Sequence, residues 1–153
     1  MASDPPLHAS APPAPPLVGW RLLALLYDLF PALALWFLVG AIGLQLRGGE
    51  PVHADTPAGW LELLALWGIT GTYAVASWRR GGQTLGMRPW RLQVLGAGGA
   101  AAGTPGLAVR YAVGTLSLLL AGAGFWWAWI DRDRLTWHDR ASGTRLARLP
   151  PRP

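Results

Sequence analysis

The side chains that could do chemistry are a few ionisable residues set into long apolar stretches. Arg21 and Asp28 are seven residues apart in the first stretch. A helix would therefore place them on one face, about 10 Å apart along its axis. That separation is too long for a direct bond, so each is expected to meet a partner elsewhere in the chain. Arg110 is the best candidate partner for Asp28.

Asp28 can be interpreted in two ways. An ionisable group within a membrane helix costs at least about 2.5 kcal/mol to insert, and such residues often mark an ion pathway. Asp28 could therefore be a proton- or cation-binding carboxylate whose partner tunes its pKa. It could equally be one half of an ion pair between helices that only fixes their packing.

His138, Asp139 and Arg140 follow one another near the end of the chain. A His–Asp pair is typical of general bases, but a catalytic triad also needs a nucleophile and an oxyanion site. Ser142 and Thr144 are near in sequence but lack the turn that presents a nucleophile. We expect no enzymatic activity, no metal and no cofactor. Asp139 is expected to cap a turn by accepting bonds from backbone N–H groups.

A glycine-containing segment follows the second apolar stretch and comprises Gly82, Gln83, Thr84, Leu85, Gly86, Met87 and Arg88. It lacks the lysine and the spacing of a phosphate-binding loop, and no strand is expected before it. Its glycines permit a tight turn. Arg88 and the nearby Trp90 suit the interface between membrane and water. The sequence therefore predicts a short interfacial segment and not a nucleotide site.

Three long apolar stretches must position these residues. Residues 29–46 and 111–130 contain no charge, and residues 58–78 contain only Glu62. About 18 such residues are enough to cross the roughly 30 Å hydrocarbon core of a bilayer as a helix. The predicted fold class is an all-α membrane protein with about three transmembrane helices. These helices are expected close to residues 17–46, 58–78 and 107–130.

The ends of the chain differ from this apolar middle. Residues 1–16 are rich in Pro and Ala and contain no Arg or Lys, which predicts a disordered tail and not a signal peptide. The transmembrane domain is expected at residues 17–149, followed by a disordered end at residues 150–153. All 13 basic residues are Arg. Because they flank the apolar stretches, the expected partner is anionic lipid and not nucleic acid.

Basic residues beside membrane helices tend to stay in the cytoplasm. This rule predicts a cytoplasmic loop at residues 79–91 and a periplasmic loop at residues 47–57. Three crossings would place the Arg-rich tail, residues 131–153, on the side opposite the cytoplasmic loop. A re-entrant last segment that turns at residues 121–124 would place it on the same side. The sequence leaves the side of the tail open.

The order of these motifs resembles the RDD family, bacterial membrane proteins named for one arginine and two aspartates. The residues that carry the resemblance are Arg21, Asp28, residues 82–86, Arg110 and residues 135–144. The naming residues match Arg21, Asp28 and Asp139. Family members often carry Lys where this chain has Met87, and Arg88 could supply that charge. The resemblance implies a small multipass protein of the bacterial inner membrane, with a function often proposed to be transport.

We therefore expect transport of an ion or small ligand, with Asp28 as the membrane-embedded site. Arg21, Arg110 and Asp139 are its expected electrostatic partners. Three helices make a poor pore alone, so self-association or a membrane protein partner is also expected. The alternative is a non-transport accessory or assembly subunit, in which the polar residues only stabilise the fold.

Overall fold

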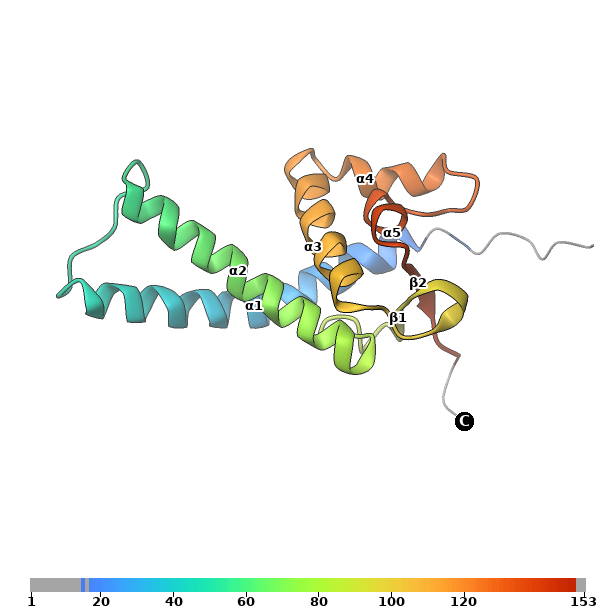
Figure 1. Cartoon of the computed structure of the whole chain (residues 1–153), viewed down its shortest axis with the longest axis horizontal. Helices are drawn as coiled ribbons and strands as arrows, with labels where there is room; N and C mark the ends of the chain where they lie inside the picture. Colours follow the sequence, from blue (N-terminus) through green and yellow to red (C-terminus); the bar gives the residue numbers. More distant parts are fainter. Residues whose placement is uncertain (1–14, 16, 151–153) are drawn as a thin grey trace, which may run out of the picture.

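The computed structural model describes residue 15 and residues 17–150. The predicted disorder of residues 1–16 and 150–153 therefore falls almost entirely outside the described residues. A two-helix arm projects from a compact body (Figure 1). The arm consists of α1 (Val18–Leu46) and α2 (Pro57–Gly81). The body contains β1 (Leu92–Leu95), α3 (Thr104–Leu119), α4 (Ala123–Trp126), α5 (Trp137–Ser142) and β2 (Arg145–Arg148), with 3₁₀ turns at Ala97–Gly99 and Trp127–Trp129.

The two helices of the arm lie close to where the apolar stretches predict them. α1 continues through Pro31 without interruption. α2 begins after Thr56, whose side chain accepts a hydrogen bond from the backbone N–H of Gly59 at 3.2 Å, and Pro57 occupies its first turn. Both features are favoured at helix N-termini. α2 ends at Gly81, and the next residue, Gly82, is in the left-handed conformation that often terminates helices.

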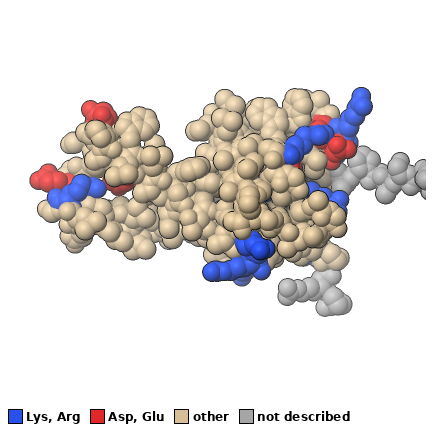
Figure 2. Space-filling model, in the orientation of Figure 1, with Lys and Arg blue, Asp and Glu red and all other residues tan. Residues whose placement is uncertain are grey.

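Large apolar side chains point outward along the arm. Phe30, Phe37 and Leu46 are 72%, 81% and 84% exposed, and Leu61 is 70% exposed. Charged residues gather at the tip of the arm and on the body, and the surface between them is uncharged (Figure 2). The 18 residues from 29 to 46 would span about 27 Å as a helix, close to the thickness of the hydrocarbon core. Such a face suits lipid and not water.

Of the described helices, α1 alone is long and apolar enough by itself to cross a membrane. α2 is less apolar, and it carries Glu62, which pairs with Arg47 at 3.1 Å near the tip. α3 and the segment Ala123–Trp129 would together be long enough for a second span, but they are bent by 107°. The predicted count of three transmembrane helices is therefore not established by the helix lengths.

The expected continuous helix over residues 107–130 is wrong. α3 ends at Leu119, and the chain turns at Ala121 and Gly122, which have φ angles of 53° and 76°. These left-handed conformations cannot continue an α-helix. The turn falls at the start of residues 121–124, where the sequence allowed one, and α4 follows it and contacts both α3 and α5.

The all-α prediction misses a two-stranded sheet. β1 and β2 pair antiparallel, with Leu92 opposite Arg148 and Leu95 opposite Arg145. The pairing attaches the C-terminal tail to the segment that follows the Arg-rich loop at residues 79–91. Both basic regions therefore lie at the same end of the molecule, which favours the arrangement that places them on one side of a membrane.

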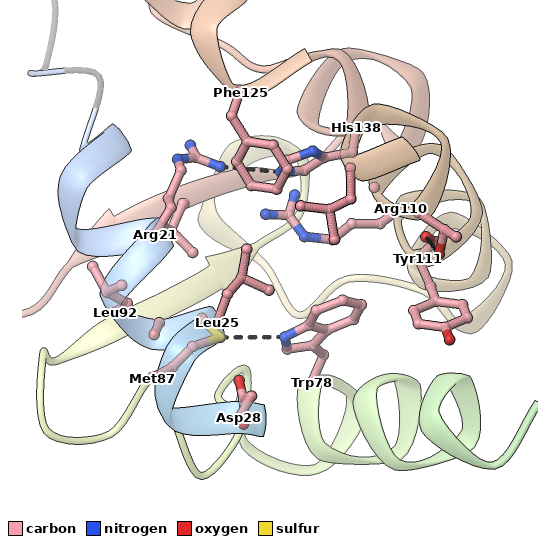
Figure 3. A pocket seen from close by; sticks show the side chains of 15 residues that line it. Arg21, Leu25, Asp28, Trp78, Met87, Leu92, Arg110, Tyr111, Phe125 and His138 are labelled. Carbon is pink, nitrogen blue, oxygen red and sulfur yellow. Dashed lines mark hydrogen bonds between the residues drawn. The ribbon is translucent and has the colours of Figure 1, made fainter. Parts of the chain in front are cut away.

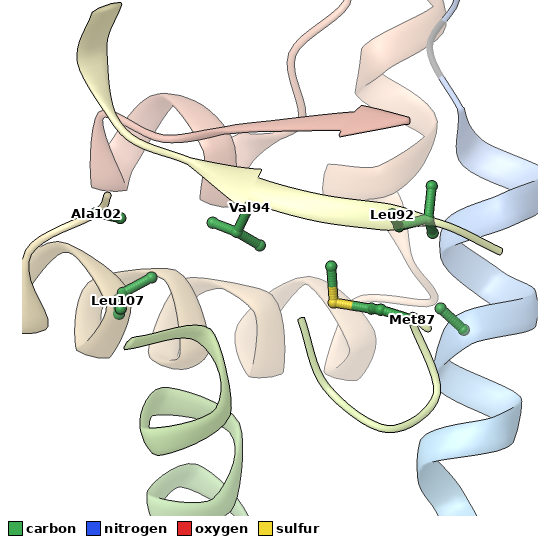
Figure 4. Packing of buried hydrophobic residues seen from close by; sticks show 6 residues of the cluster. Met87, Leu92, Val94, Ala102 and Leu107 are labelled. Atoms are coloured by element: carbon green, nitrogen blue, oxygen red, sulfur yellow. The ribbon is translucent and has the colours of Figure 1, made fainter. Parts of the chain in front are cut away.

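The hydrophobic core of the body lies beneath this sheet. Leu92 and Val94 alternate with outward-facing residues along β1, as a half-buried strand requires. They pack with Met87 of the loop and Leu107 of α3 (Figure 4). Ala24 of α1 belongs to the same cluster. The core thus fixes the loop, the sheet and α3 against the base of the arm.

Candidate functional site

A carboxylate shared by two arginines forms the buried polar centre of the body. Asp139 is fully buried, and its two oxygens accept hydrogen bonds from Arg21 at 2.6 Å and from Arg110 at 2.5 Å. Both guanidiniums are themselves buried. The three residues come from α5, α1 and α3, so one carboxylate joins two helices of the body to the base of the arm.

Local structure fixes the Asp139 carboxylate before any arginine reaches it. Thr136 and Asp139 form a capping box at the start of α5, in which each side chain bonds to the backbone N–H of the other. This arrangement satisfies two N–H groups that a helix terminus leaves open. The prediction that Asp139 caps a turn is confirmed.

Arg110 and Arg21 also contact neutral groups. Arg110 donates to the hydroxyl of Thr144 at 2.8 Å, and its guanidinium lies 5.6 Å from the centre of the Trp78 ring. Arg21 lies 3.3 Å from Nε2 of His138. Such neutral contacts hold the two cations in place without balancing their charge.

Charge and burial set the protonation states of this centre. Burial alone would raise the pKa of Asp139, but the Arg110 and Arg21 guanidiniums outweigh it and hold that pKa well below its usual range. Burial, aided by Arg110, lowers the pKa of His138 to about 3. At pH 7 the centre therefore contains two positive groups, one negative group and a neutral imidazole.

The predicted ion pair between Arg110 and Asp28 is wrong. Arg110 pairs with Asp139, and Asp28, two turns along α1 from Arg21, bonds only neutral donors among the described residues. The expectation that Arg21 and Asp28 each meet a partner elsewhere is confirmed. The four predicted polar-core residues thus divide into a triad of Arg21, Arg110 and Asp139 and a separate carboxylate at Asp28.

Asp28 joins the loop motif to both helices of the arm. Its carboxylate accepts hydrogen bonds from the Tyr73 hydroxyl at 2.8 Å, the Gly86 backbone N–H at 2.8 Å and the Thr84 hydroxyl. Tyr73 belongs to α2, and its hydroxyl also accepts from the backbone N–H of Leu85. The Asp28 carboxylate is thus ringed by two hydroxyls and one amide.

The contact of the loop with α1 at Asp28 explains most of the residues in the loop motif. Gly86 passes so close to α1 that an added Cβ would lie 2.2 Å from the carbonyl oxygen of Ala24. The Gln83 amide donates to the carbonyl of Leu92 at 2.6 Å and holds the loop against β1. Arg88 is exposed, as an interfacial residue would be, and Met87 is buried in the core.

A cavity of about 140 Å³ lies between the two polar groups. Arg21, Arg110 and His138 line one end, and Asp28 lines the opposite end (Figure 3). The walls between them are mainly apolar and include Leu25, Trp78, Met87, Leu92 and Phe125. The arrangement offers cationic and neutral donors at one end of the cavity and a carboxylate at the other.

Several residues of this site could not be found by their sequence spacing. Tyr73, Thr136 and Thr144 reach it from three different segments. The only available signal was a hydroxyl within an apolar stretch or beside the His138–Asp139 pair. Such residues are too common in sequences for that signal to distinguish them.

Comparison with known proteins supports the resemblance carried by these motifs. A sequence model described as the RDD family matches residues 15–143. The matched span includes Arg21, Asp28, Arg110 and Asp139. No curated protein and no solved structure matches the chain.

Proposed function

This chain belongs to the RDD family of integral membrane proteins, and we propose on that premise that it takes part in transport of an ion or small ligand through a site at Asp28. The arm formed by α1 and α2 crosses the bacterial inner membrane in this proposal. The exposed apolar residues of the arm support that placement, because they need a lipid environment.

The observation that carries the proposal is the charge of Asp28. In the described part of the chain, no arginine forms a salt bridge with this carboxylate, whereas Glu62 on the same arm is paired with Arg47. An ionisable group in an apolar helix without a countercharge is a functional candidate. A bound proton or cation would supply the missing positive charge.

The partners of Asp28 suit a group that changes its charge. The hydroxyls of Tyr73 and Thr84 donate to the carboxylate, but a hydroxyl can also accept a hydrogen bond. Each could therefore remain in contact with a protonated Asp28, or offer a lone pair to a cation beside it. The Gly86 N–H can only donate, so it requires an oxygen of Asp28 that accepts.

Flux in proteoliposomes tests this role. Vesicles with an imposed sodium or potassium gradient and a trapped pH-sensitive dye should show exchange with the wild-type protein. Asp28→Asn should abolish it because an amide cannot titrate, and Asp28→Glu should retain part of it with a shifted pH dependence. Glu62→Gln is the matched control, since Glu62 is the other carboxylate of the arm and should be dispensable.

Folding must be followed in the same samples. Asp28→Asn should reconstitute and melt as a folded protein, because Asn can still accept from Tyr73 and Gly86. Wild-type vesicles that behave like empty ones, for several ions and both gradient directions, would refute ion–proton exchange for those ions.

An accessory subunit is the second candidate function. The outward-facing apolar residues of the arm, such as Phe37 and Leu61, could contact helices of another membrane protein as well as lipid. In that case a stable partner should co-purify in mild detergent. Substituting Phe37→Ala would release it, and no flux would be seen with the isolated chain.

A further inference from the structure

Two residues at one end of the cavity, Arg21 and His138, carry buried nitrogens without hydrogen-bond partners in the described part of the chain. Among the described residues, neither Nε of Arg21 nor Nδ1 of His138 has a partner. Arg21 and His138 are 6% and 4% exposed, and both line the cavity. Buried polar groups are nearly always hydrogen-bonded, so such exceptions require an explanation.

The chemistry of His138 shows that its free nitrogen is a donor. Arg21 Nη1 can only donate, so His138 Nε2, 3.3 Å away, must accept. The imidazole is neutral because burial lowers the pKa of His138. Its single ring proton therefore lies on Nδ1. Both unsatisfied atoms thus require an acceptor.

The charge at this end of the cavity requires the same kind of group. Arg21 and Arg110 carry two positive charges against the one negative charge of Asp139. Asp28 does not balance the excess at contact distance, because it bonds Tyr73, Thr84 and Gly86 at the other end. An anion beside Arg21 and His138 would neutralise the centre.

The other residues that line the cavity indicate what the rest of the ligand should be. Leu25, Trp78, Met87 and Phe125 are apolar or aromatic. The volume of about 140 Å³ is close to that of a cavity of about 150 Å³ that accepts benzene. The ligand should therefore carry one acceptor group on a compact apolar body.

We propose that this cavity binds a small apolar carboxylate of about the size of benzoate, with its carboxylate at Arg21 and His138 and its body against Trp78 and Phe125. This deepens the proposed function by naming a ligand class for the same cavity. It rests on that function only through the shared cavity, and not on ion exchange at Asp28.

The direct test is titration of the purified full-length protein in an uncharged detergent at pH 7, followed by calorimetry. Benzoate should bind and raise the melting temperature. Benzyl alcohol and benzylamine should bind at least about tenfold more weakly, because they lack a carboxylate. Phosphate and chloride should also fail, because they lack the apolar body. Equal binding of benzyl alcohol, or of phosphate alone, would overturn the proposal.

Gly114 of α3 allows the cavity to be filled without disturbing the polar centre. It lines the cavity, and a Cβ at this position would have no neighbour within 4 Å. Gly114→Leu should abolish benzoate binding in a folded protein. Gly68→Leu is the matched control, because Gly68 also lies within a helix with open space around it but does not line this cavity. Unchanged binding in Gly114→Leu would contradict the assignment.

His138 tests the donor directly. His138→Phe should weaken benzoate binding at least about tenfold, and His138→Gln, which can still accept and donate, should restore most of it. Asp28→Asn should keep benzoate binding, because Asp28 lies at the opposite end. Benzoate binding by a wild-type protein that shows no ion flux would sustain this inference and refute ion exchange at Asp28. Ion flux without benzoate binding would sustain ion exchange at Asp28 and refute this inference.

Discussion

Among the described residues, Asp139 is the one carboxylate that bonds the buried guanidiniums of Arg21 and Arg110, and its energetic role follows from this ratio of one negative charge to two positive charges. A buried ion pair often contributes little net stability, because desolvation of the charges offsets their attraction. Removing one member is far more damaging, since it leaves the opposite charge buried and unpaired. In this protein the loss of one carboxylate would leave two such charges, those of Arg21 and Arg110.

Asp139→Asn should therefore destabilise the protein by about 3–5 kcal/mol or more. The measurements are thermal unfolding in detergent and the amount of protein that accumulates in the membrane. Asp133→Asn is the matched control, because Asp133 is 67% exposed and pairs with Arg140 only at the surface. Equal melting of Asp139→Asn and Asp133→Asn would show that the centre contributes no stability.

The residues of the centre could be named from the sequence, but their pairing could not. Arg21, Arg110 and Asp139 stand out because charges are rare near apolar stretches. Nothing in a linear spacing tells whether Arg110 faces Asp28 or Asp139. That choice is decided by the turn at Gly122, which brings α5 back onto α3, and by the capping box that orients Asp139.

At the scale of elements, the loop at residues 82–91 connects α1, α2 and β1 at the base of the arm through hydrogen bonds. Thr84 and Gly86 contact Asp28 of α1, while Gln83 contacts β1. These contacts require the backbone of the loop at Gly86 to lie against the backbone of α1 at Ala24, which leaves no space for a side chain at Gly86.

Gly86→Ala should consequently lower the melting temperature and weaken the contacts between the loop and α1. The added Cβ would lie 2.2 Å from the carbonyl of Ala24 and 2.7 Å from Cγ of Asp28, so the loop must move, at a cost of roughly 1–3 kcal/mol. Gly68→Ala provides the comparison. It has open space in α2 and should be neutral, or stabilising by up to about 1 kcal/mol, because Ala favours helix more than Gly. Faster proteolysis after residue 82 in Gly86→Ala alone would localise the damage, and identical melting of both variants would disprove it.

The sequence predicts α1 and α2 well because the length of each stretch, its apolar content and the residues at its ends all indicate a helix. It does not predict β1 and β2, since each has four residues and about 50 residues separate them. A strand of that length presents only two buried side chains, too few for a periodic signal to emerge. The sequence indicates a turn at residues 121–124 only as the alternative to a continuous helix, because the break depends on positive φ at Ala121 and Gly122 and alanine rarely adopts that conformation.

At the scale of the whole molecule, the pairing of β1 with β2 predicts the topology. If the arm crosses the membrane as proposed, the loop at residues 79–91 and the C-terminal strand lie on one side of the membrane and the tip of the arm lies on the other. Positive charge favours the cytoplasm for the first side. The chain contains no cysteine, so single cysteines can report their position.

An impermeant maleimide added to intact cells should label His53→Cys but neither Pro89→Cys nor Leu149→Cys. All three positions are exposed on the protein surface. Cell lysis should make the latter two reactive, which serves as the control for accessibility. Labelling of Leu149→Cys without Pro89→Cys in intact cells would contradict the paired strands.

The triad also imposes an order on biosynthesis. Arg21 leaves the ribosome well before its carboxylate, because Asp139 is 118 residues further along the chain. During most of synthesis the nascent helix therefore carries a cation that has no native partner, and Arg110 joins it before Asp139 emerges. The body cannot fold until residues 136–148 have been synthesised. A chain shortened before residue 139 would retain both arginines but would lack the capping box of α5 and the strand β2. Quality-control proteases would degrade such a chain because it cannot fold. Folding of the whole protein therefore depends on the C-terminal segment.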